Sequence, residues 1–191
     1  MHTYQELDSF EYWSITDKDQ FSISVLKGLI MDAVRKANSG HPGGAMSSAD
    51  FIYLLFKDYL KFDPKDPNWF DRDRFILSGG HMSMLQYSIL HLVGWMKLSE
   101  IKKFRQLGSQ TPGHPEVEIP GVECTTGPLG QGLAMGVGMA LAEAYLSSLI
   151  SNDDKDSKKL IDHFTYVLAT DGDLQEPVAL GAAAIAGHLG L

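Results

Sequence analysis

Two short apolar runs, each followed by a glycine-containing turn and a helical pattern, constrain the fold of this chain most. The first is Arg74–Leu77, which passes through a Ser-Gly-Gly-His turn into a helix. The second is 165–170, followed by an Asp-Gly-Asp turn and a helix that Pro177 opens. Strands that alternate with helices favour a mainly parallel sheet with helices on both faces. We therefore predict an α/β fold, in which ligands bind at the carboxyl ends of the strands.

Apolar residues at helical spacing predict a long amphipathic helix near the start of the chain, over residues 18–37. Thr16 and Asp19 form a capping box ahead of it, because their side chains can satisfy free amides of the first turn. Gly40 supplies the stop.

Four more helical patterns follow. They cover residues 51–60, 84–93, 99–107 and 132–150, and the first of them leaves the His-Pro-Gly-Gly sequence of 41–44 as a loop. The polar composition of residues 151–159 predicts a surface loop. With 191 residues and no internal repeat, the chain reads as one domain or a part of one.

Charge and cysteine content exclude several classes of protein. The formal net charge is −8, and no Lys/Arg stripe could track a phosphate backbone, so nucleic acid is not an expected partner. A single cysteine, Cys124, allows no internal disulfide and favours a reducing compartment. The acidic first 19 residues fit neither a secretory signal nor a transit peptide. We expect a cytoplasmic location.

The most apolar stretch, 132–150, has two interpretations. Its Gly132-x-x-x-Gly136 spacing is also found in transmembrane helix dimers. Glu143 lies inside it, however, and an apolar helix is equally typical of a buried α/β core. We predict a core helix and no membrane association.

The glycine-rich sequence 127–132, at the entry to that helix, is a weak candidate for an anion site. Small residues let backbone amides approach an anion, and the helix dipole favours negative charge there. Glycines before an apolar helix more often serve turning or close packing. Both interpretations stay open on this sequence alone.

Three acidic residues follow the second strand: Asp171, Asp173 and Glu176. A carboxylate at a strand end is a suitable ligand for Mg²⁺ when a diphosphate completes the coordination. Alternatively, Asp171 or Asp173 caps the next helix.

Three histidines, His41, His81 and His114, each stand beside glycine or proline in predicted loops. Such histidines can hydrogen-bond a phosphate or transfer protons near neutral pH. The others have structural or exposed roles in this interpretation: His2, His91, His163 and His188. The residues alone thus indicate an α/β domain with a diphosphate and Mg²⁺ site lined by histidines.

Five strings, in order, resemble transketolase. They are KANSGHPGG (36–44), DRDRFILSGGH (71–81), FRQL (104–107), TPGHPE (111–116) and TTGPLGQG (125–132). The resemblance extends over residues 37–176 and implies a thiamine-diphosphate-binding fold, with the chain being the N-terminal diphosphate-binding domain (1–191), incomplete at its C-terminal end.

The resemblance also implies roles for single residues. Asp171 would hold the metal, Mg²⁺ or Ca²⁺. The residues near the cofactor would be His81, Gly127, Leu129 and Gly172. His41 and His114 would face the sugar, and Glu176 would belong to a network linking two cofactor sites.

The implied reaction is the transfer of a two-carbon ketol unit from a ketose phosphate to an aldose phosphate, as in the pentose phosphate pathway. The cofactor's ring carbon, as a carbanion, would add to the ketose carbonyl, while the protein supplies orientation and proton transfer. The implied partner is a second copy of the chain, or a C-terminal subunit with the pyrimidine-binding domain. We expect the isolated chain to be inactive.

Some positions depart from the family pattern. Thr170 stands where glycine precedes the metal ligand, Gly80 where asparagine is common, and Pro177 where glycine is usual. Gly181 stands where a second glutamate is expected, as in the pyruvate dehydrogenase branch of the superfamily.

Two alternatives remain: another thiamine-diphosphate enzyme, of the deoxyxylulose-phosphate synthase or pyruvate dehydrogenase type, and a non-catalytic association module. The PGHPE string argues against the former, and retention of Asp171 with the three histidines against the latter.

Overall fold

The computed structural model describes residues 9–150 and 160–191. Within them, two parallel strands pair: β1 (Arg74–Leu77) and β2 (Thr165–Leu168). The helices in chain order are α1 (Ile15–Ala37), α2 (Pro42–Ser47), α3 (Ala49–Leu54), the π-helical turn η2 (Leu55–Tyr59), the 3₁₀ turn η3 (Gly80–Met82), α4 (Ser83–Leu92), α5 (Leu98–Ile101), α6 (Gln131–Ile150), the 3₁₀ turn η4 (Asp173–Gln175) and α7 (Pro177–Leu189).

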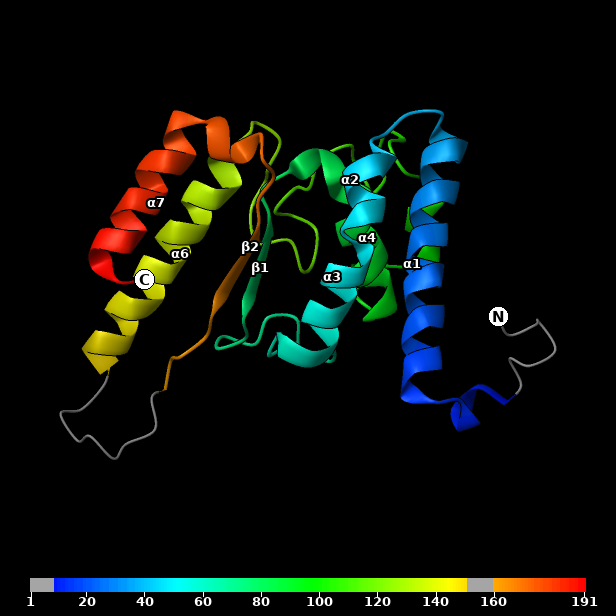
Figure 1. The fold of residues 1–191 in the computed structure, drawn as a ribbon, viewed down its shortest axis with the longest axis horizontal. Coiled ribbons are helices and arrows are strands. Elements are labelled where there is room, and N and C mark those ends of the chain that lie inside the picture. The colour runs from blue at the N-terminus through cyan, green and yellow to red at the C-terminus, as the bar shows by residue number, and fades with distance from the viewer. Residues whose placement is uncertain (1–8, 151–159) are drawn as a thin grey trace.

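The helices flank the sheet on both sides (Figure 1). Helices α6 and α7 lie on one side, α2, α3 and α4 lie on the other, and α1 is outermost. Arg74 pairs with Thr165 and Leu77 with Leu168, so both strands end at the same edge. This arrangement confirms the predicted α/β fold with a parallel sheet.

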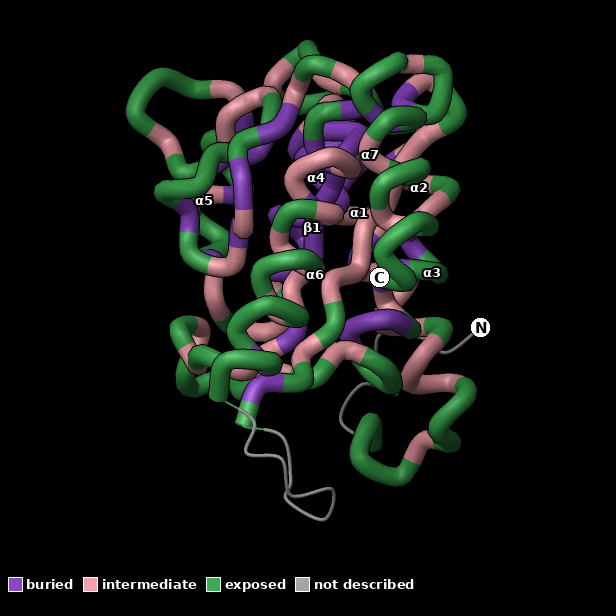
Figure 2. The backbone as a smooth tube through the Cα atoms, turned by 90° about the vertical axis from the view of Figure 1, so that its left-hand side faces the viewer, coloured by how far each residue is buried: buried purple, intermediate pink, exposed green. Residues whose placement is uncertain are grey.

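The core lies between β1, α4 and α1. Eight consecutive residues of α4, from Ser83 to Leu90, are buried, because this helix is enclosed on all sides. Leu26 and Ile30 of α1 pack into the same core. Figure 2 shows buried backbone concentrated here, whereas α6 and α7 are largely exposed or intermediate.

The first helix is confirmed together with its last residue, Ala37, but its predicted start and its predicted stop residue are wrong. Ser14 is the N-cap, and its Oγ accepts a hydrogen bond from the Asp17 amide at 3.1 Å. The helix therefore begins ahead of the predicted capping box. Asn38 is the C-cap, and its φ of 48° is left-handed, a conformation that Asn tolerates, so the stop comes before Gly40.

Two other predicted boundaries are also wrong. Residues 41–44 are not a loop, because Pro42, with its fixed φ, starts α2 and the glycines continue it. The charged helix predicted over 99–107 is only α5. Arg105, with φ 60°, turns the chain, and its amide bonds the carbonyl of Thr111 at 2.8 Å.

Glycines let α6 lie close to the sheet. A Cβ built at Gly136 would lie 2.5 Å from Cγ2 of Val167, and one at Gly132 would lie 2.5 Å from Cα of Ser78. The helix is not the fully buried core helix that we predicted, because only its sheet-facing side is covered: Gly132, Gly136 and Ser147 are its buried residues. By length and composition α6 could cross a membrane, a test that core helices also pass. The predicted loop 151–159 lies outside the described residues.

Candidate functional site

A buried carboxylate, that of Asp173, holds the carboxyl edge of the sheet together. Its Oδ1 accepts hydrogen bonds from Ser78 Oγ at 2.9 Å and the Gly130 amide at 2.7 Å. Its Oδ2 accepts them from the amide and hydroxyl of Thr170, at 2.7 and 2.9 Å. Asp173 thus connects the ends of β1 and β2 to the entry of α6.

Asp173 stays ionised in this position. Burial by itself raises its pKa, but the hydrogen bonds from Gly130, Thr170 and Ser78 together hold the pKa below its ordinary value. The capping interpretation is wrong for Asp173, because neither η4 nor α7 receives a side-chain cap. The carboxylate instead binds the Gly130 amide, directly ahead of α6. Thr170, a departure from the family pattern, supplies two of the four hydrogen bonds.

The start of α6 uses some of its amides within the protein. The Gly130 amide bonds Asp173, and the Leu133 amide bonds Ser78 Oγ at 3.1 Å. The glycine-rich entry thus serves close packing. Whether its other backbone groups also approach an anion stays a prediction.

Asp171 differs from Asp173 in its exposure to solvent and in its lack of bonding partners among the described residues. It is exposed, and within the described residues it makes no hydrogen bond or ion pair. The described residues hold no group of three or more His, Cys, Asp or Glu side chains placed so that it could hold a metal ion. A single carboxylate nevertheless suits Mg²⁺, which often keeps one or two protein ligands beside phosphate and water.

Three further predicted residues lie around the turn that carries Asp171. A Cβ built at the neighbouring Gly172 would lie 3.2 Å from Cδ1 of Leu129. A Cβ at Gly130, where φ is 80°, would lie 2.8 Å from Cβ of Glu176. Leu129, Gly172 and Glu176 therefore border the same junction between α6 and the turn after β2.

The three histidines that the sequence singled out come together in space. The rings of His41 and His81 lie 5.4 Å apart, near-perpendicular. A Cβ at Gly127 would lie 3.5 Å from the His114 ring, which places this glycine beside it. His41 is 73 positions from His114 in the chain, yet it lies close enough for its charge to lower the pKa of His114.

His114 is held mainly in its neutral form. Burial lowers its pKa, and the nearby positive charge of Arg105 lowers it further. A neutral imidazole can both donate and accept a proton. His114 therefore has the state that a proton-transferring group needs near neutral pH.

Helix α4 fixes the backbone of the loop that carries His114. Ser83 Oγ donates to the carbonyl of Gly113 at 2.9 Å, and the Tyr87 hydroxyl donates to that of His114 at 3.1 Å. The hydroxyl of Thr126 donates to the carbonyl of Leu77 at 2.8 Å, which ties the next segment to β1. The loop geometry is thus set by the core.

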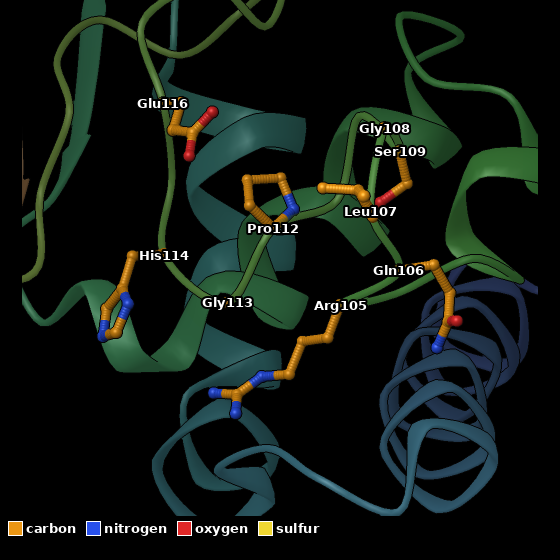
Figure 3. Close-up of a pocket in the computed structure, with 9 residues that line it drawn as sticks. All are labelled: Arg105, Gln106, Leu107, Gly108, Ser109, Pro112, Gly113, His114 and Glu116. Carbon is orange, nitrogen blue, oxygen red and sulfur yellow. The ribbon is translucent and has the colours of Figure 1, made fainter.

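A cleft of about 660 Å³ opens beside this loop (Figure 3). Its lining residues are Arg105, Gln106, Leu107, Gly108, Ser109, Pro112, Gly113, His114 and Glu116. Arg105 and His114 extend to the same side of the loop in Figure 3. Of these, only His114 was a predicted site residue.

Arg105 is the residue that the sequence interpretation missed. Its guanidinium donates to Ser39 Oγ at 2.7 Å and lies 3.4 Å from Nδ1 of His41. Among the described residues no carboxylate pairs with it. The FRQL string contains Arg105, but nothing in that string alone indicates these distant contacts.

The fold and the gathered loops define an α/β domain with a polar, histidine-rich site at the carboxyl edge of its sheet. The family described as "Transketolase, thiamine diphosphate binding domain" matches residues 18–191. The chain therefore belongs to the N-terminal domain family of transketolases.

Individual relatives agree. The chain is 55% identical over 170 residues to transketolase 2 of Escherichia coli K12, covering 88% of the chain and 25% of the relative. It is 53% identical over 173 residues to the transketolase of Staphylococcus epidermidis, covering 90% of the chain and 26% of the relative. The chain thus spans about a quarter of the length of these relatives.

Solved structures show the same fold. The transketolase from Leishmania mexicana superposes with a TM-score of 0.85 at 44% identity, over 90% of this chain and 25% of that one. A transketolase from Pichia stipitis gives 0.84 at 48% identity with the same coverage.

Proposed function

We propose that this chain forms the diphosphate and metal part of a thiamine diphosphate site that transfers two-carbon ketol units from a ketose phosphate to an aldose phosphate. The observation that carries the proposal is the meeting of His41, His81 and His114 at the sheet edge where Asp171 stands exposed. A parallel sheet binds ligands at this edge.

The charges of the site fit an anionic cofactor with a divalent metal. Arg105 lacks a carboxylate partner among the described residues and lies beside His41, so the site offers hydrogen-bond donors to phosphate oxygens. Asp171 offers a carboxylate to Mg²⁺ or Ca²⁺. In this proposal Asp171 holds the metal, and the diphosphate lies against His81 and Gly172.

The remaining assignments concern the reacting end of the site. Thiamine diphosphate supplies, when bound, a nucleophilic ring carbon that the protein itself lacks. Gly127 and Leu129 would border the thiazolium ring. His41 and His114 would hydrogen-bond the sugar, and a neutral His114 would take up or release a proton there. Glu176 would connect this site to a second one.

Relatives support sugar phosphates as substrates. Structures of Pichia stipitis transketolase carry fructose 6-phosphate in one case and sedoheptulose 7-phosphate in another. We extend this substrate class to the present chain, together with assembly as a homodimer or with a C-terminal partner subunit. A cytoplasmic location accords with the single cysteine, Cys124, which is free and buried.

Calorimetric titration of the 191-residue chain with thiamine diphosphate, with and without Mg²⁺, tests the proposal. We expect heat of binding only with Mg²⁺, and a loss of about tenfold or more in affinity in Asp171→Asn, because the metal loses its charged ligand. Asp32→Asn, an exposed carboxylate on α1, is the matched control and should bind as the wild type does. Metal-independent binding, or equal binding by Asp171→Asn, would contradict the proposal.

The two histidine roles are separable in the same titration. His81→Ala should weaken cofactor binding, because His81 is assigned to the diphosphate. His114→Ala should leave the affinity nearly unchanged, because His114 is assigned to the sugar. The reverse pattern would refute both assignments.

A further inference from the structure

The position of Arg105 is unusually well fixed for an arginine near a cleft. Its backbone adopts the left-handed φ of 60°, and its amide bonds the carbonyl of Thr111 at 2.8 Å. Its Nη1 donates to Ser39 Oγ at 2.7 Å, from 66 positions away in the chain. Hydrogen bonds therefore hold both the backbone and the guanidinium of Arg105 in place.

The loop opposite packs closely on this group at Gly113, which has no side chain. A Cβ there would lie 3.2 Å from both Cζ and Nε of Arg105. The Nε atom is buried and has no hydrogen-bond partner. The guanidinium is thus closely covered on one side, and its Nη2 is directed at His41.

The contact between Arg105 and His41 determines which ring nitrogen of His41 carries the proton. Nη2 lies 3.4 Å from Nδ1 of His41, a contact somewhat longer than an ordinary N–H hydrogen bond. A guanidinium has only donors and stays protonated, so Nδ1 must be the acceptor. In neutral His41 the proton then resides on Nε2.

We infer that Arg105 is a positioning residue that holds His41 as the Nε2-protonated tautomer. His41 then presents an N–H donor, and not a lone pair, at Nε2. This assignment of the His41 tautomer does not depend on any bound ligand. If the proposed function holds, the consequence is that His41 donates to an oxygen of the sugar, whereas proton abstraction falls to another group.

A second histidine of the same chain provides the opposite case. Nδ1 of His91 lies 2.8 Å from the carbonyl oxygen of Met96, which can only accept. His91 must therefore carry its proton on Nδ1. His91 thus provides an internal standard for the Nδ1-protonated tautomer.

Nitrogen NMR of the histidine-labelled 191-residue chain at about pH 8, where imidazoles are mainly neutral, tests the inference. We expect His41 and His91 to show opposite patterns of ring cross-peaks. Arg105→Met removes the donors but keeps the aliphatic stem. It should shift the Nδ1 resonance of His41 and raise the Nδ1-protonated share several-fold, with His91 unchanged. Gln106→Ala, in the same turn, is the control and should leave His41 as in the wild type.

Two results would overturn the inference: a wild-type His41 protonated on Nδ1, or an Arg105→Met spectrum in which His41 is unchanged. Should Arg105→Met not fold, Ser39→Ala takes its place, because it frees the guanidinium without removing it. A shifted Nδ1 resonance of His41 then supports the inference, and an unshifted one overturns it. Neither readout depends on cofactor or turnover, so failure here is distinct from failure of the proposed function.

Discussion

Asp173 shows how one side chain can carry the local architecture of a ligand edge. Replacing it by asparagine keeps the size but removes the charge and puts a donor where an acceptor is needed. Because hydrogen bonds to a buried charged group contribute about 1.5–3 kcal/mol each, we expect Asp173→Asn to lower the free energy of unfolding by roughly 2–4 kcal/mol. Chemical denaturation measures this directly.

The same variant should show a defined pH dependence. The folded pKa of Asp173 lies below its ordinary value of 3.8, so its stabilisation is present above that value and is lost as the pH falls through the folded pKa. The difference in stability between wild type and Asp173→Asn should therefore be greatest above about pH 5 and shrink in more acidic solution. Asp171→Asn, exposed and unpaired among the described residues, serves as the control with no such difference.

At the scale of elements, the packing of α6 against the sheet depends on glycine in some positions and not in others. Gly136 faces Val167 with no room for a Cβ, whereas Gly138 has nothing within 4 Å of an added Cβ. Alanine is the better helix former by about 1 kcal/mol. We expect Gly138→Ala to stabilise the chain by up to about that amount and Gly136→Ala to destabilise it.

Thermal unfolding of the two variants measures both effects. The substitution is the same, glycine to alanine, at two positions that are two residues apart in one helix. If both substitutions changed the stability in the same direction, helix propensity, and not contact with β2, would dominate the effect of these positions in α6.

Local periodicity was sufficient to predict most of the elements. A pattern within each segment predicts the two strands and the helices α1, α4, α6 and α7. The existence of these elements was therefore predicted correctly. The truncation of α5 was not predictable in this way, because it depends on the left-handed turn at Arg105 and on a bond to Thr111. The start of α2 depends on Pro42, which the glycines beside it obscured.

The site shows the same division. The three histidines were identified because glycine and proline mark their loops in the sequence. Arg105 was missed because its partners, Ser39 and His41, lie 66 and 64 positions away. The role of Asp173 was only partly predicted, because its bond to Ser78 spans 95 positions and a local pattern cannot show that.

For the molecule as a whole, the distribution of apolar surface is uneven. Helices α6 and α7 pack on each other beside the sheet, but their outer sides carry large apolar residues. Leu149 is 63% exposed and Ile185 is 54% exposed. Other exposed apolar residues of these helices are Leu141, Tyr145, Leu146, Ile150, Val178, Leu180 and Leu189. Large apolar side chains exposed together on two helices that pack on each other are typical of a contact surface.

We therefore expect the 191-residue chain to self-associate in solution, with α6 and α7 at the contact. Light scattering over a range of concentrations should give a mass above 21.0 kDa. The double variant Leu149→Glu/Ile185→Glu should shift the mass toward the monomer, because burying two carboxylates in an apolar contact costs several kcal/mol. Leu107→Glu is the matched control: Leu107 is fully exposed but lies in the turn beside the cleft, away from these helices, so association should persist. A wild-type chain that stays monomeric at every concentration, or a double variant that associates as the wild type does, would contradict the assignment of this surface.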